Sequence, residues 1–193
     1  MALSTGSKKI KTAVFISGTG SNLKSLIKFS KLKKSPISIN LIVSNNPKSK
    51  GLKYGKRFKI KSKFFNYKKK STAEKKIILE LKKNRINFIC LAGFMKILSK
   101  NFIKSFKGKI LNIHPSLLPR FKGLNTHERV IKNNETYSGC TVHFVNSKLD
   151  SGKIILQKKV KINKNDTPRT LSKKILIQEH KLYPKAILKI FNL

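Results

Sequence analysis

The sequence predicts a single-domain α/β protein with a mostly parallel, twisted sheet of about seven strands, helices on both faces and an antiparallel strand pair near the C-terminal end. Over the first 130 residues, short apolar runs rich in β-branched residues alternate with segments whose apolar residues recur at helical spacing. Near the end, two strand-like runs are joined by only about eight residues, which is too short for the crossover that parallel strands need.

The expected strands are short apolar runs bounded by polar or turn-forming residues, namely 12–17, 36–44, 63–67, 87–92, 109–113, 139–145 and 154–162. The expected helices carry apolar stripes at helical spacing, and they are 22–33, 51–59, 72–85, 99–106, 127–133 and 167–189. Thr72 is the expected N-cap of its helix. The domain is expected to span residues 11–193. Residues 1–10 are expected to be a leader outside it, disordered or foreign to the natural protein.

Composition favours a globular protein of the cytoplasm. With 39% hydrophobic residues in a chain of 193, a substantial core can form. No apolar run approaches the ~20 residues that span a bilayer, and the N-terminus lacks an apolar segment of signal-peptide length. Cys90 and Cys140 lie in apolar runs and are expected to be buried free thiols.

The formal charge of +38, from 45 basic and 7 acidic residues, raises the alternative of a lysine-rich nucleic-acid-binding protein. Only five of the basic residues are Arg, whereas proteins that read phosphates and base edges favour its bidentate guanidinium. The lysines are also spread along the whole chain, which indicates a solvated surface, so no specific nucleic-acid partner is expected. Lysine is absent from residues 86–95, 110–121 and 133–147.

The segment GTGSN, residues 18–22, follows the first expected strand and opens the first expected helix. Its glycines permit close backbone approach, and free N–H groups at the positive end of a helix suit a phosphate group. It is neither a P-loop nor a full G-x-G-x-x-G motif. On chemistry alone, phosphate binding and a plain tight turn therefore remain equally open.

Asn112 and His114 lie in the segment NIHP, where alternation along a strand places both on one face. An Asn carboxamide can donate to a developing oxyanion, and a His can move a proton or stabilise that anion as imidazolium. Asp150, in the turn LDSG at another strand end, can orient the imidazole and favour its charged form. The alternative is that His114 only caps its loop and Asp150 is an ordinary turn residue.

The remaining histidines, His127, His143 and His180, are expected in structural roles. No histidine, cysteine or carboxylate motif has the spacing of a metal site. No metal is expected.

Five segments resemble the phosphoribosylglycinamide formyltransferase family, namely FISGTGSNL, LAGFMKILS, LNIHPSLLPRFKG, TVHFVNSKLDSG and IILQKKV. They occur in order, with family-like spacing, over about residues 12–190. The resemblance implies a Rossmann-like formyltransferase fold and metal-free transfer of the formyl group of 10-formyltetrahydrofolate to the amino group of N1-(5-phosphoribosyl)glycinamide. The products would be formylglycinamide ribonucleotide and tetrahydrofolate, in the third step of purine (IMP) biosynthesis.

The resemblance also implies roles for individual residues. The residues that match the family's catalytic trio are Asn112, His114 and Asp150. Those that match its substrate-binding residues are Gly18, Thr19, Gly20, Ser21 and Asn22 at the phosphate and Glu179 at the ribose. Those that match its folate-binding residues are Lys70 near the glutamate tail, Met95, Lys96, Ile97 and Leu98 at the pterin, and Asn112. In the resulting hypothesis, Asn112 and protonated His114 stabilise the tetrahedral oxyanion while Asp150 assists proton movement.

Four residues depart from the usual pattern of that family. Thr19 stands where many members have Asn, which keeps the backbone of the phosphate loop but changes a side-chain contact. Lys96 replaces a frequent Arg. Lys122 and Asn125 occupy places often held by Pro and His, which alters the stiffness of their loop.

Methionyl-tRNA formyltransferase is the nearest alternative, because it shares the formyl-transfer fold and a similar Asn, His and Asp set. That family carries an additional C-terminal domain for which this chain has no residues, and it does not need the GTGSN segment. Small-molecule substrates, no membrane association and a monomer or weak homodimer are therefore expected.

Overall fold

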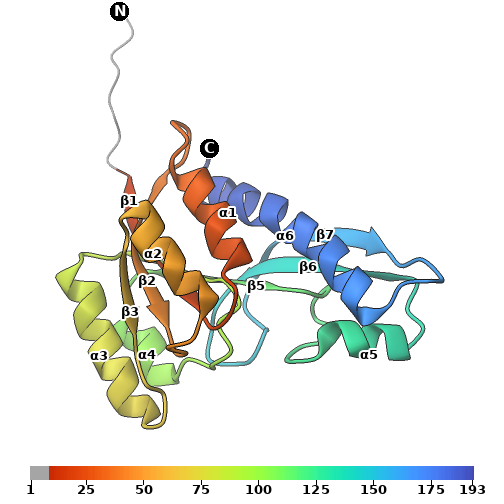
Figure 1. Ribbon diagram of the computed structural model, residues 1–193, viewed down its shortest axis with the longest axis horizontal. Coiled ribbons are helices and arrows are strands. Elements are labelled where there is room, and N and C mark those ends of the chain that lie inside the picture. Colours follow the sequence, from red (N-terminus) through yellow and green to blue (C-terminus); the bar gives the residue numbers. More distant parts are fainter. Residues whose placement is uncertain (1–8) are drawn as a thin grey trace, which may run out of the picture.

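The computed structural model describes residues 9–193 (Figure 1). Residues 1–8, which make up most of the expected leader, lie outside the described residues. The strands are β1 (Ile10–Ile16), β2 (Ile37–Ser44), β3 (Lys61–Phe64), β4 (Phe88–Leu91), β5 (Lys109–His114), β6 (Tyr137–Phe144) and β7 (Ile154–Lys161). The helices are α1 (Ser21–Ser30), the 3-10 helix η1 (Lys50–Leu52), α2 (Lys53–Phe58), α3 (Lys70–Lys83), α4 (Lys100–Ser105), α5 (Thr126–Lys132) and α6 (Pro168–Ile190).

The seven strands form one sheet in the order β3-β2-β1-β4-β5-β6-β7. Strands β1 to β5 are parallel, and β6 pairs antiparallel with both β5 and β7. The predicted α/β class and the β6–β7 antiparallel pair are thus confirmed, and the antiparallel part extends one strand further than predicted. Because chain order reverses between β1 and β4, their carboxyl ends diverge into a crevice where ligands bind in such sheets.

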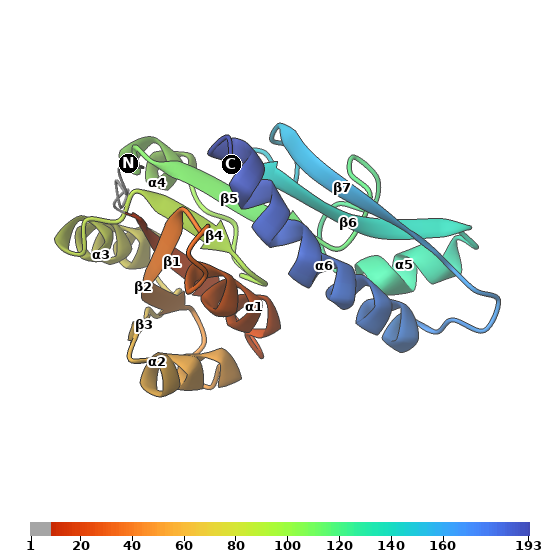
Figure 2. The same ribbon diagram turned by 90° about the horizontal axis from the view of Figure 1, so that it is seen from above.

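Helices cover both faces of the sheet (Figures 1 and 2). Successive side chains of a strand point to opposite faces. Val14 and Ile16 of β1 therefore pack in the cluster that includes α1, α5 and α6, while Ala13 and Phe15 pack in the cluster with α3 and α4. Both clusters contain fully buried aliphatic side chains, so the central strands are apolar on both sides.

Two predicted boundaries were wrong. The third strand ends at Phe64 instead of continuing to residue 67. Helix α3 begins at Lys70 with Lys69 as its N-cap, so that Thr72 lies inside the first turn. The bond from the Ala73 N–H to the Lys69 carbonyl closes a turn before Thr72 could act as a cap. Cys90 and Cys140 are free and buried, as predicted.

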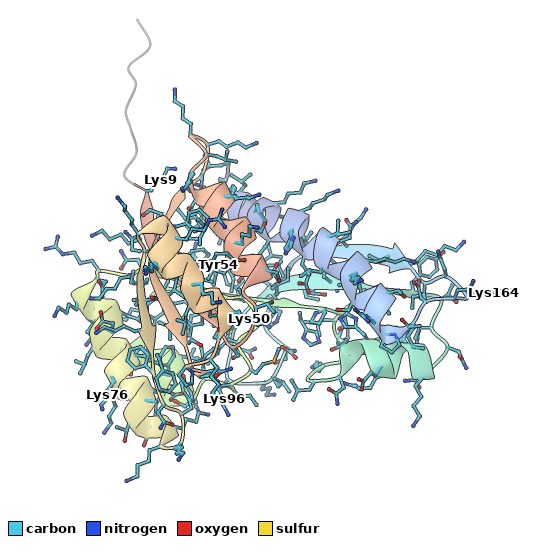
Figure 3. All side chains as sticks on the ribbon, in the orientation of Figure 1. Lys9, Lys50, Tyr54, Lys76, Lys96 and Lys164 are labelled. Atoms are coloured by element: carbon cyan, nitrogen blue, oxygen red, sulfur yellow. The ribbon has the colours of Figure 1, made fainter. Side chains whose placement is uncertain are left out.

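Lysines cover the surface and both edges of the sheet. Lys9, Lys76 and Lys164 lie far apart on the outside of the molecule (Figure 3). On the edge strand β3, Lys61 and Lys63 pair with the carboxylate of Glu80 at 2.6 and 2.5 Å. Burial alone would raise the pKa of Glu80, but hydrogen bonds from both lysines and from Asn84 lower it to about 2.

Tyr183 of α6 fixes the helix to the two central strands next to the crevice. Its buried hydroxyl lies 3.1 Å from the Leu91 carbonyl of β4 and 3.1 Å from the Leu111 carbonyl of β5. One hydroxyl proton serves these two acceptors; Leu91 is the last residue of β4, and Leu111 directly precedes Asn112 in β5. The hydroxyl therefore sets the distance between α6 and the ends of β4 and β5.

Replacing Tyr183 by Phe is expected to lower the free energy of unfolding by about 1–2 kcal/mol, because buried carbonyls lose their donor. Urea denaturation followed by circular dichroism measures the change. The matched control is Tyr54→Phe on α2, where the half-buried ring is expected to lose less than about 0.5 kcal/mol. Equal losses in the two variants would contradict the role of the Tyr183 hydroxyl.

Candidate active site

A cavity of about 960 Å³ lies at the carboxyl ends of β1, β4 and β5. One wall is a face of α6, and another is the turn between β6 and β7. Of the residues predicted for catalysis, substrate binding or cofactor binding, all line this cavity except Lys70. Lys70 is exposed at the first turn of α3.

The segment Gly18 to Asn22 forms the floor of one end of the cavity. Gly20 has φ +75°, and a Cβ placed on it would lie 2.7 Å from the Cα of Gly51, so this position requires glycine. The Gly18 carbonyl accepts hydrogen bonds from the Gly51 N–H (3.1 Å) and the Ser49 hydroxyl (2.6 Å). The loop is thereby held in one shape in front of the N-terminus of α1, which suits a bound anion. Thr19 and Ser21 complete this segment of the cavity wall.

Asn22 and Glu179 join the phosphate-loop end of the cavity to α6. The Asn22 Nδ2 donates to Glu179 Oε2 at 2.7 Å, and both side chains are buried. Asn22 Oδ1 has no hydrogen-bond partner among the described residues. Burial raises the pKa of Glu179 to about 7, and the bond from Asn22 opposes this rise only in part. The pair thus lines the cavity with a buried carboxyl group, one oxygen of which is bonded to Asn22.

Asp150 and Asn112 meet at the centre of the cavity. Asn112 Nδ2 donates to Asp150 Oδ1 at 3.3 Å, and the backbone N–H of Gly123 donates to Asp150 Oδ2 at 2.9 Å. Burial would raise the pKa of Asp150, but the contacts with His143, the Gly123 N–H and His114 lower it below its ordinary value. Asp150 is therefore a carboxylate at neutral pH.

His114 lies beside that carboxylate, with its Nδ1 3.4 Å from Asp150 Oδ2. Its Nε2 donates to the Phe121 carbonyl at 2.8 Å, because a carbonyl can only accept. Burial lowers the pKa of His114, and the Phe121 carbonyl and the Asp150 charge oppose this only partly. Burial therefore favours the neutral ring at rest near pH 7.

His143 belongs to the same cluster, although the sequence indicated only a structural role. It pairs directly with Asn112 across the antiparallel β5–β6 ladder, which places both side chains on one face. Its Nδ1 donates to the Phe144 carbonyl at 2.8 Å, so its Nε2 accepts from Asn112 Nδ2 at 3.2 Å. The same Nε2 is 3.7 Å from Asp150 Oδ1, a contact between charge and dipole. The sequence signal for the position of His143 was the alternation in GCTVHFV. This alternation places His143 beside Asn112 only once β6 is known to pair with β5.

The other two histidines lie outside this cluster. His127 lines the cavity from the first turn of α5, and its buried Nδ1 has no partner among residues 9–193. His180 lies on α6, where its carbonyl accepts from the Ser25 hydroxyl at 3.0 Å.

The segment Gly93–Leu98 lines another part of the cavity. Met95 and Ile97 are 62% and 57% exposed, which is unusual for large apolar side chains. Lys96 is also exposed, whereas Leu98 is buried. An apolar rim of this kind fits a flat, partly apolar ligand such as a pterin.

Within residues 9–193, no cluster of three or more His, Cys, Asp or Glu side chains is arranged to hold a metal ion. In the same part of the chain, no helix is long and apolar enough to cross a membrane.

Known proteins resemble this chain in both sequence and structure. Residues 10–187 match the formyl transferase family. The chain is 36% identical to phosphoribosylglycinamide formyltransferase of Bacillus subtilis (strain 168), over 95% of each chain. It is 44% identical to the human trifunctional purine biosynthetic protein adenosine-3, over 93% of this chain and 18% of that protein. The chain therefore spans less than a fifth of the length of this trifunctional relative.

The solved structures agree. The crystal structure of phosphoribosylglycinamide formyltransferase from Brucella melitensis superposes with a TM-score of 0.89 at 38% identity, covering 95% of this chain and 96% of that chain. The protein from Bacillus Halodurans gives a TM-score of 0.89 at 34% identity, covering 93% and 94%. With a family match over nearly the whole described chain and the same seven-stranded fold, the protein belongs to the formyl transferase family.

Proposed function

We propose that the protein transfers the formyl group of 10-formyltetrahydrofolate to the amino group of N1-(5-phosphoribosyl)glycinamide, in purine biosynthesis. The observation that supports this most strongly is the position of Asn112, His114 and Asp150 between a phosphate-type loop and an apolar rim in one cavity. A folate-derived co-substrate suits the family. The amine substrate is inferred from relatives that are named phosphoribosylglycinamide formyltransferase.

The substrate's phosphate would bind the N–H groups of residues 18–22, at the positive end of α1. Its ribose hydroxyls would meet Glu179, whose side chain lines this part of the cavity. The pterin of the folate would lie on the backbone of residues 93–98, between Met95 and Ile97. The two reacting groups then meet at Asn112, because it lies between the two ends of the cavity.

In the reaction, the neutral amine forms a bond to the formyl carbon, and the carbonyl electron pair moves onto the formyl oxygen. Asn112, whose two amide N–H groups at rest point to Asp150 and His143, redirects one of them to that oxygen as its negative charge develops. The bond from the formyl carbon to the folate nitrogen then breaks, and this nitrogen takes up a proton while the amine loses one. Asp150, as a carboxylate, accepts and passes on that proton.

His114 acts in its protonated form, which it reaches by taking up a proton from solvent before the amine attacks. Its neutral ring dominates at rest because burial lowers its pKa. A negative charge on the formyl oxygen favours the imidazolium, which the Asp150 carboxylate at 3.4 Å also stabilises. His114 is therefore assigned to electrostatic stabilisation of the oxyanion.

The alternative substrate, methionyl-tRNA, is disfavoured because formyltransferases that act on it do not need a loop such as GTGSN. Lysines on all sides predict only weak binding of RNA that falls steeply with salt. We place the reaction in the cytoplasm, where the free thiols of Cys90 and Cys140 stay reduced.

The function is tested by following folate absorbance with purified phosphoribosylglycinamide and 10-formyltetrahydrofolate, beside a reaction without the amine. Asn112→Ala is expected to lower kcat by about 100-fold or more, because one oxyanion donor is lost. The control is Asn87→Ala, on an exposed Asn before β4 at the opposite end of the sheet, with unchanged kcat expected. Absence of amine-dependent signal in the wild type would refute the proposed function. Near-normal kcat in folded Asn112→Ala would refute the role of Asn112.

Glu179→Gln is expected to change how stability depends on pH. Since the folded pKa of Glu179 is about 7 and exceeds its ordinary value of 4.5, the folded state binds more protons between these values. This contribution therefore lowers wild-type stability as pH rises from 4.5 to 7. In chemical denaturation at pH 5 and pH 8, Glu179→Gln should lack this contribution to the loss of stability with rising pH. The free energy of unfolding of the variant, relative to that of wild type, should therefore be higher at pH 8 than at pH 5. A pH-independent difference between the two proteins would contradict the raised pKa.

A further inference from the structure

Glu74, on α3 and outside the cavity lining, makes contacts that bear directly on the folate end of the site. Its side chain is 5% exposed, although it is charged. Its Oε1 accepts from the backbone N–H of Ser99 at 2.9 Å, and its Oε2 accepts from the Ser99 hydroxyl. Both carboxylate oxygens are thus committed to the residue that directly follows Leu98.

Ser99 is the point where the cavity-lining segment ends and α4 begins. Its Oγ accepts from the Phe102 N–H at 3.0 Å, as expected of an N-cap. The hydroxyl donates its own proton to Glu74, so donor and acceptor functions of Ser99 are both used. The position of the residue is therefore fixed from α3 as well as from α4.

The other end of the segment is held independently. Ser17 donates its N–H to the Gly93 carbonyl at 3.0 Å, and its Oγ accepts from the Met95 N–H at 2.7 Å. Between these ends, the ring of Phe94 packs edge-to-face on Phe15 at 5.3 Å. Among residues 9–193, Glu74 is the one side chain outside this segment and α4 that forms hydrogen bonds with Ser99.

The pKa of the Tyr67 hydroxyl also reflects the nearby Glu74 carboxylate. Burial, and after it the nearby Glu74 carboxylate, raise the pKa of Tyr67 well above its ordinary value. The Tyr67 ring packs edge-to-face on Phe94 at 5.7 Å. The carboxylate thus lies beneath the segment, next to the aromatic cluster that supports it.

We propose that Glu74 is a positioning residue for the folate co-substrate: by holding Ser99, it fixes the backbone of residues 93–98 in the shape that receives the pterin. The inference rests on the proposed function. Loss of Glu74 should therefore weaken binding of the folate but not of the amine substrate. The phosphate-loop end of the cavity is held by Gly51, Ser49 and α6, and it makes no contact with Glu74.

The test compares Glu74→Ala with wild type by steady-state kinetics for both substrates and by calorimetric titration with tetrahydrofolate. The KM for the formyl donor and the Kd for tetrahydrofolate are expected to rise about 10-fold, because hydrogen bonds to a charged group are lost. The KM for the amine substrate should change by less than about twofold. Glu74→Gln should be intermediate, because its amide oxygen still accepts from the Ser99 N–H.

The matched control is Glu80→Ala, which removes an equally buried carboxylate from the same helix. Glu80 binds Lys61 and Lys63 on the far edge of the sheet, so its loss should lower the Tm without changing either KM. Ser99→Ala should repeat the Glu74→Ala effect, and the double variant should add little to either single change.

Equal increases in both KM values, or a lowered Tm with unchanged tetrahydrofolate affinity, would overturn the inference and leave the proposed function intact. If Glu74→Ala fails to fold, Glu74→Gln with unchanged folate affinity overturns it equally. Wild-type protein that binds no tetrahydrofolate and transfers no formyl group would overturn both.

Discussion

The carboxylate of Asp150 joins segments that are far apart in the chain, and the geometry of the site depends on it. It accepts from Asn112 at the end of β5 and from the Gly123 N–H in the loop before α5, and it lies beside His114 and His143. The molecule has 45 basic and 7 acidic residues. One buried negative charge therefore organises the reacting centre in a strongly positive protein, and its own lowered pKa reflects the donors gathered around it.

The two ends of the cavity rest on different supports. The phosphate loop is fixed by Gly51 and by α6, while residues 93–98 are fixed by Ser17 and, beyond them, by α3. Ser17 directly precedes the phosphate loop, so the two ends share one connecting residue. Under the proposed function, each ligand would be bound by its own part of the fold and the reacting groups would meet at Asn112.

The sequence alone predicted those features that depend on residues close together in the chain. Alternation along one strand placed Asn112 and His114 together, and the lysine-free runs proved to cover β4, β6 and all of β5 except Lys109, strands that are largely buried on both faces. His143 was missed because its contact with Asn112 comes from pairing between strands that no periodicity reveals. Likewise, the cap expected at Thr72 failed because a backbone bond one turn earlier decided where α3 begins.

The lysines of β3 and β7 affect how separate molecules meet. An open sheet presents unpaired N–H and C=O groups along its two outer strands, which are templates for a strand from another molecule. Here Lys61 and Lys63 flank one edge and Lys158, Lys159 and Lys161 flank the other. A second molecule approaching in register would bring the same charges face to face. The excess of lysine therefore protects the sheet against aggregation at high protein concentration, and this protection weakens as salt screens the charges.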